Sequence, residues 1–113
     1  MIWAQLKQIE LVVWMEQKQH INELLVITME ECAELIQECS KRIRFPDTAN
    51  EEEWRVRITK EAGDVLCMIN LLIEDDLVSE YGLPLQAKKK LKKLKNWSSL
   101  FKEPKDIDWS DYH

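Results

Sequence analysis

Two segments of the chain place carboxylates at the spacing of one helical turn. Glu31 and Glu34 are three residues apart, and so are Glu61 and Asp64. Side chains at this spacing project from the same side of a helix, so each pair presents its two carboxylates together. Carboxylate oxygens are hard ligands that suit Mg²⁺ or Mn²⁺. If the two helices pack antiparallel, the four carboxylates meet as a metal site; single pairs of this kind also occur as ordinary surface charge.

More acids surround the first pair. On a helix with about 100° per residue, a sector roughly 100° wide holds Glu30, Glu31, Glu34, Glu38 and Lys41. The opposite side is apolar, with Leu25, Met29, Cys32, Ile36 and Ile43. Glu61 and Asp64 precede an almost unbroken apolar run, residues 65–73, which is typical of a helix buried on all sides. Acids beside such a run need compensation, either by a metal or by Arg57 and Lys60.

Other metal and phosphate chemistry fits the composition less well. Zinc sites use His or Cys ligands, and a di-iron bundle needs Glu-x-x-His on two helices. His20 and His113 follow no glutamate at that spacing, and the 3 cysteines form no Cys-x-x-Cys pair. With 2 glycines, Gly63 and Gly82, there is no glycine-rich phosphate loop. The charge pattern favours Mg²⁺ with a phosphate: residues 30–80 hold 14 acids and 6 bases, a net charge of −8, whereas six of residues 86–95 are lysines.

Helical periodicity and breakers define the elements that would position these residues. We expect helices over residues 2–18, over 23–44 with Asn22 as the N-cap, from 50 or 51 to between 77 and 79, and over 85–97. The fold class is therefore all-α, a small four-helix bundle in which two long antiparallel helices carry the acidic site. Residues 1–97 form one domain, and 98–113 an irregular tail. So thin a bundle is best completed by oligomerisation.

The composition also bears on the compartment. The odd number of cysteines argues against a disulfide framework and for reducing, cytoplasmic surroundings. Lys7 and Glu10 interrupt the first apolar run, which therefore does not resemble a signal peptide. No stretch of about 18 apolar residues predicts a transmembrane helix.

The segment Glu30-Glu31-x-x-Glu34, followed at a distance by Glu61-x-x-Asp64, resembles the EExxE…ExxD signature of MazG-like nucleoside triphosphate pyrophosphohydrolases, an all-α superfamily. The resemblance covers roughly residues 20–97, including the lysine-rich end. It implies Mg²⁺-dependent hydrolysis of a nucleoside or deoxynucleoside triphosphate to the monophosphate and pyrophosphate, by a homodimer or a dimer of dimers. Where many members follow the C-terminal lysine with an arginine or another polar group, this chain has Ser98, Ser99 and Leu100.

Carried over by position, the resemblance makes Glu31, Glu34, Glu61 and Asp64 the metal ligands. It leaves the catalytic role in orienting or deprotonating water open among Glu30, Glu34 and Glu38. Candidates for triphosphate contacts are Lys41, Arg57, Lys90 and Lys93. Trp14 or Trp54 could stack on a base, although such tryptophans more often lie in a core or an interface.

Three alternatives stay open at this point. The first is a phosphoribosyl-ATP pyrophosphatase, which belongs to the same superfamily. The second is a non-catalytic helical interaction module whose acids bind a basic partner. The third, a nucleic-acid binder that uses residues 88–95, fits poorly with a net charge of −5. The pattern predicts no membrane partner. It does not determine the preferred base and sugar.

Overall fold

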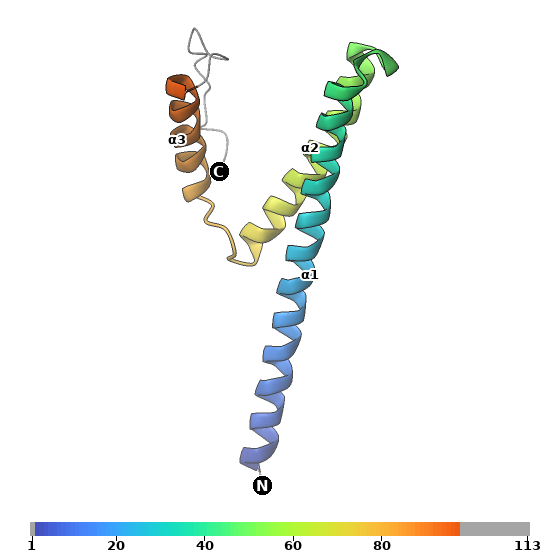
Figure 1. The fold of residues 1–113 in the computed structure, drawn as a ribbon. Helices are drawn as coiled ribbons and strands as arrows, with labels where there is room; N and C mark the ends of the chain where they lie inside the picture. The colour runs from blue at the N-terminus through green and yellow to red at the C-terminus, as the bar shows by residue number, and fades with distance from the viewer. Residues whose placement is uncertain (1, 98–113) are drawn as a thin grey trace. The chain divides into compact units, whose positions relative to one another are not determined.

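The computed structural model describes residues 2–97, which are helical throughout apart from short connections (Figure 1). It contains α1 (Ile2–Arg44), a 3₁₀ turn η1 (Pro46–Thr48), α2 (Glu51–Glu74) and α3 (Gly82–Trp97). Residues 2–97 contain no strand, which confirms the all-α class. The chain divides into two compact units, residues 1–75 and 76–113, and we describe each separately. No described helix combines the length and the apolar character needed to cross a bilayer.

The first two expected helices are one continuous helix, so the prediction of four helices is wrong. α1 runs for 43 residues, from Ile2 to Arg44. Asn22 lies within it and caps no helix. Residues 2–44 contain neither Gly nor Pro, and the polar residues around His20 are compatible with a helix. The N-capping residue type at position 22 was therefore a false signal, because nothing next to it interrupts the backbone.

The chain reverses between α1 and α2 through residues 45–50. Asn50 caps α2 with a reciprocal pair of bonds. The Glu53 backbone N–H donates to Asn50 Oδ1 at 2.8 Å, and the Asn50 backbone N–H donates to Glu53 Oε1 at 3.4 Å. This confirms the expected helix start. α2 ends at Glu74, earlier than expected, and Asp76 follows with φ 61, the left-handed conformation that stops a helix.

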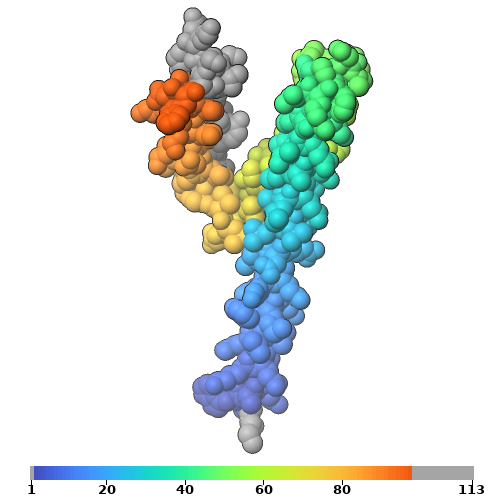
Figure 2. All heavy atoms as spheres, in the orientation of Figure 1, coloured from blue at the N-terminus to red at the C-terminus, as the bar shows by residue number. Residues whose placement is uncertain are grey.

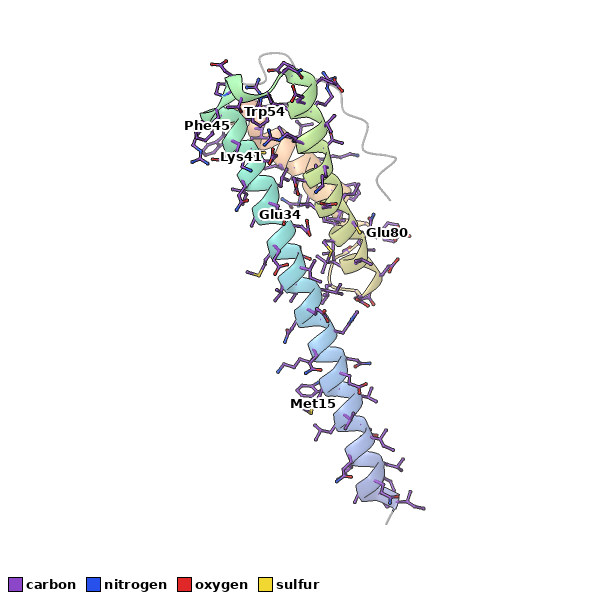
Figure 3. The ribbon with its side chains drawn as sticks, turned by 90° about the vertical axis from the view of Figure 1, so that its right-hand side faces the viewer. Met15, Glu34, Lys41, Phe45, Trp54 and Glu80 are labelled. Carbon is purple, nitrogen blue, oxygen red and sulfur yellow. The ribbon has the colours of Figure 1, made fainter. Side chains whose placement is uncertain are left out.

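α1 and α2 form an antiparallel hairpin with a thin core (Figure 3). Its buried apolar side chains are Leu24, Trp54, Met68 and Leu72. Trp54 is only 2% exposed, and its indole N–H donates to the carbonyl oxygen of Pro46 at 3.2 Å. The expectation that the 65–73 segment is buried on all sides is wrong, since Leu66 is 51% exposed. The hairpin covers one face of α2 and leaves the other to solvent.

The second unit contains α3, which begins at Gly82 rather than at the expected Leu85. Ser79 precedes it, and its Oγ accepts a bond from the Gly82 backbone N–H at 3.0 Å. Pro84 lies in the first turn, where its missing N–H costs nothing. The helix carries the whole lysine run, Lys88–Lys95. The expected tail, residues 98–113, lies outside the described residues.

Candidate metal centre

The hairpin brings the two carboxylate pairs together. Glu31 and Glu34 lie on α1, and Glu61 and Asp64 lie on α2. One carboxylate oxygen from each lies within 4.8 Å of the others. Glu34 lies on the side of α1 that turns toward α2 (Figure 3). We call these four residues the acidic cluster. This juxtaposition is the one expected from the spacing and an antiparallel hairpin, and four carboxylates at such distances suit a hard divalent cation.

Two of these carboxylates have buried oxygens that lack partners. Glu31 Oε2 and Glu61 Oε2 are inaccessible to solvent and accept no hydrogen bond from any described residue. The Glu61 side chain is only 15% exposed. A buried, unpaired carboxylate oxygen is costly, because it loses its water without gaining a donor. A cation within the acidic cluster would remove this cost, so the donor set fits Mg²⁺.

Electrostatic strain within the acidic cluster appears at Glu34. The negative charge of Glu31, followed by the neighbouring carboxylate of Glu61, raises the pKa of the Glu34 carboxyl above its ordinary value. Among the described residues, one cation reaches the cluster. Lys60 Nζ lies 3.3 Å from Glu61 Oε1 and 3.5 Å from Asp64 Oδ2, and Glu61 raises the pKa of this ammonium. Lys60 is 68% exposed, and one ammonium does not balance four carboxylates.

A second charged group lies one turn further along α1, and its charges are already paired. Glu38 is 8% exposed, and its Oε1 lies 2.5 Å from Arg57 Nε. Its other oxygen lies 3.7 Å from Lys41 Nζ. The Arg57 guanidinium lies over the Trp54 ring, 4.5 Å from its centroid. Arg57 therefore compensates Glu38. It does not compensate the acidic cluster, although that was one of the roles expected for it.

The remaining candidates lie apart from the acidic cluster. Glu30 is exposed on α1 and is not one of the four clustered residues. Lys90 and Lys93 are exposed on α3, in the second unit, so their role toward phosphate stays a prediction. Trp54 is buried in the core and is not available to stack on a base, whereas Trp14 is 56% exposed.

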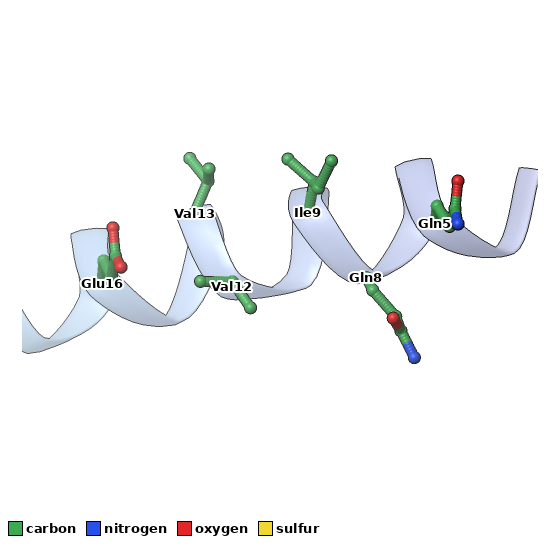
Figure 4. A pocket seen from close by; sticks show the side chains of 6 residues that line it. All are labelled: Gln5, Gln8, Ile9, Val12, Val13 and Glu16. Carbon is green, nitrogen blue, oxygen red and sulfur yellow. The ribbon is translucent and has the colours of Figure 1, made fainter. Parts of the chain in front are cut away.

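The structure adds one contact that the sequence did not indicate. His20 Nε2 lies 2.9 Å from Asp75 Oδ2, which joins α1 to the end of α2. The two residues are 55 positions apart, and neither belongs to a local motif that would have identified them. Two shallow depressions lie nearby along α1. One includes this pair, and the other is lined by α1 side chains alone (Figure 4). The depression on α1 alone encloses no ligand, and the one at His20 and Asp75 is open to solvent, so we take the acidic cluster as the candidate site.

Comparison of the chain with models of known protein families, with curated proteins and with solved structures gives no match.

Proposed function

We propose that this protein hydrolyses nucleoside or deoxynucleoside triphosphates to the monophosphate and pyrophosphate, with Mg²⁺ as cofactor. The observation that carries the proposal is the acidic cluster, whose four carboxylate oxygens from two helices lie within 4.8 Å of one another. The unpartnered buried oxygens of Glu31 and Glu61 strengthen it. The residue spacing that resembles the MazG-like signature connects this cluster to triphosphate substrates.

Each group of side chains would take a separate part of the reaction. The acidic cluster would hold the cation, which when bound neutralises phosphate oxygens and lowers the barrier to attack. A cluster carboxylate such as Glu34 would orient the attacking water by accepting its proton. Lys41 and Arg57 are 46% and 41% exposed, so they can contact phosphate while Glu38 positions them. Lys90 and Lys93 would add further phosphate contacts.

A pyrophosphate-release screen tests the proposal. The purified chain is incubated with Mg²⁺ and, separately, with NTPs, dNTPs, damaged nucleotides and phosphoribosyl-ATP. We expect turnover of at least one triphosphate that needs the metal. Asp64→Asn, which removes a ligand charge, should lower the rate by about 100-fold or more, as expected for loss of one electrostatic contact to a transition state. Glu23→Gln is the matched control, because Glu23 is an exposed acid of α1 outside the acidic cluster.

The other outcomes are equally informative. Turnover of phosphoribosyl-ATP alone would replace the proposed substrate class. Thermal unfolding with and without Mg²⁺ separates the remaining cases, because a ligand that binds only the native state raises the midpoint. A metal-dependent midpoint without turnover would leave a metal-binding helical module. If Asp64→Asn keeps the full Mg²⁺-induced rise of the wild type, the acidic cluster is not the metal site.

A further inference from the structure

The first half of α1 extends beyond the end of α2. The contact between His20 and Asp75 marks the place where the paired part of the hairpin ends. Residues 2–20 are all exposed, and in Figure 2 this blue part of the chain is a narrow column that extends past the rest of its unit. At 1.5 Å per residue it is about 28 Å long. We call residues 2–20 the overhang.

The overhang has an apolar stripe that residues 21–75 of its own unit do not cover. Ile2, Leu6, Ile9 and Val13 recur at intervals of four, three and four residues and are 71%, 47%, 59% and 45% exposed. Figure 4 shows Ile9 and Val13 on the same side of the helix. The same line continues through His20 to Leu24, which is buried in the hairpin. The stripe therefore extends the face of α1 that packs on α2, past the point where α2 ends.

An uncovered helix of this kind is unfavourable in water. Helices in proteins gain most of their stability by packing an apolar face, and the overhang does not pack its face within its own unit. The stripe with its neighbours Trp3 and Trp14, which are 79% and 56% exposed, offers on the order of 600 Å² of apolar surface. A standard protein interface buries about 800 Å² on each partner, so this area approaches what a stable dimer needs.

We propose that the overhang packs against the overhang of a second copy of this chain, with the two helices antiparallel. The four stripe residues and the polar residues that continue their line, Glu16 and His20, occupy positions 2, 6, 9, 13, 16 and 20, which are spaced symmetrically about residue 11. In the antiparallel register, each of these positions therefore faces another of them in the other copy. Ile9 faces Val13 twice, Leu6 faces Glu16, and Ile2 faces His20.

Charge and continuity favour the same arrangement. The first turn of α1 contains no acid, so the positive end of its helix dipole is uncompensated. In the antiparallel register this end lies beside His20 of the second copy, where Glu74 and Asp75 end α2. The overhang of one copy would then continue the line of α2 in the other. This inference does not depend on the proposed function.

The mass of the full chain in solution tests the proposal. Sedimentation equilibrium over a range of concentrations should give a dimer, twice the chain mass of 13.5 kDa. The double variant Leu6→Glu/Val13→Glu should weaken the dimer by at least 100-fold, because it adds four carboxylates to an interface that already contains Glu16 of each copy. Gln8→Glu/Gln19→Glu introduces the same charge on another side of the overhang, and it should dimerise like the wild type. Circular dichroism verifies that both variants stay helical.

Three results would overturn the proposal. One is a wild-type chain that is monomeric at every concentration, as it would be if its own second unit covered the stripe. Another is a Leu6→Glu/Val13→Glu variant that dimerises like the wild type. The third is a dimer that resists this variant but is broken by Met29→Glu/Ile36→Glu, which lie on the outer face of the hairpin and are 70% and 68% exposed.

Thiol cross-linking tests the orientation. In a background whose three cysteines are replaced by serine, Leu6→Cys and Glu16→Cys chains are prepared separately and then mixed. The antiparallel register predicts a disulfide on mild oxidation only in the mixture, because two copies of one position are about 15 Å apart along the axis. Efficient cross-linking of Leu6→Cys chains alone would show parallel helices and reject the proposed register.

Discussion

The two halves of α1 carry different side chains on the helix face that packs on α2. In residues 21–44, the face that packs on α2 carries Leu24 but also Glu31 and Glu38, which are largely covered. In the overhang, the continuation of that face carries the apolar stripe, whose four side chains are 45% to 71% exposed. One half therefore covers charge, and the other exposes hydrocarbon. Each arrangement is unfavourable by itself, and each would be relieved by a binding partner, a cation in the first case and a second helix in the second.

This difference indicates where stability and function are separated. The hairpin has few buried apolar residues, and part of its contact area is given to the acidic cluster. Natural proteins accept such local cost at sites that bind ligands. The overhang contributes nothing to the hairpin core, so we expect substitutions there to act on association and not on the folding of one chain. The following predictions test this division.

The largest expected effect on stability is that of Trp54→Ala. Trp54 is 2% exposed, lies under Arg57 and donates to the Pro46 carbonyl. Removing so large a buried ring should destabilise the hairpin by about 3–5 kcal/mol, measured by urea unfolding. Trp3→Ala, the same change at a side chain that is 79% exposed, should change the stability of the dilute chain by less than about 0.5 kcal/mol. Equal losses of stability from both variants would contradict the idea that the hairpin determines folding and the overhang only association.

A leucine pair on the same stripe gives the next largest contrast. Leu24 is 8% exposed and Leu6 is 47% exposed. Leu24→Ala should cost about 2–5 kcal/mol at any protein concentration. Leu6→Ala should cost little in dilute solution and more as the concentration rises, because its effect is on the dimer. Unfolding midpoints measured over a hundredfold range of concentration distinguish the two. A concentration-independent loss for Leu6→Ala would mean that the overhang packs within one chain.

Sequence reasoning predicted local features of this molecule better than their surroundings. The spacing of Glu31, Glu34, Glu61 and Asp64 and a single reversal near Pro46 were enough to predict that these residues meet. The start of α2 at residue 50 or 51 was also evident, because a helix start depends on neighbouring residues. The junction near Asn22 was not, since a capping residue type starts a helix only where the backbone is interrupted.

Helical periodicity could not predict which face of α1 packs on α2. Met29, Ile36 and Ile43 form an apolar side opposite the acids, yet all three are more than two-thirds exposed. A helical period groups residues by angle but does not determine which group a neighbouring helix covers. In the same way, six lysines on α3 identify a basic helix without placing it beside the acidic cluster. Such placement depends on contacts between distant segments.

A smaller effect of the opposite sign should follow from weakening the acidic cluster. Without metal, Glu34→Gln removes a carboxylate that Glu31 and Glu61 repel. The thermal midpoint of the metal-free variant should therefore lie above that of the wild type. With saturating Mg²⁺ the order should reverse, because the variant lacks a ligand. Glu23→Gln, outside the cluster, should do neither. A metal-free midpoint that falls in Glu34→Gln would show that the carboxylates are not in conflict.

The smallest expected effect is a pH dependence of the difference in thermal midpoint between metal-free Glu34→Gln and the metal-free wild type. The pKa of Glu34 is raised above its ordinary value of 4.5, so the folded chain binds this proton more tightly than the unfolded chain does. The ionised Glu34 carboxylate thus destabilises the folded chain fully above the folded-state pKa, and this destabilisation disappears as the pH falls to 4.5. The metal-free midpoint of Glu34→Gln minus that of the wild type should shrink over this window. The Mg²⁺-induced rise of the wild type should shrink too, because protons compete with the metal for carboxylates. A metal-free difference that grows on acidification would mean that Glu34 has a favourable partner in the folded chain, and the acidic cluster would then need no cation at that position.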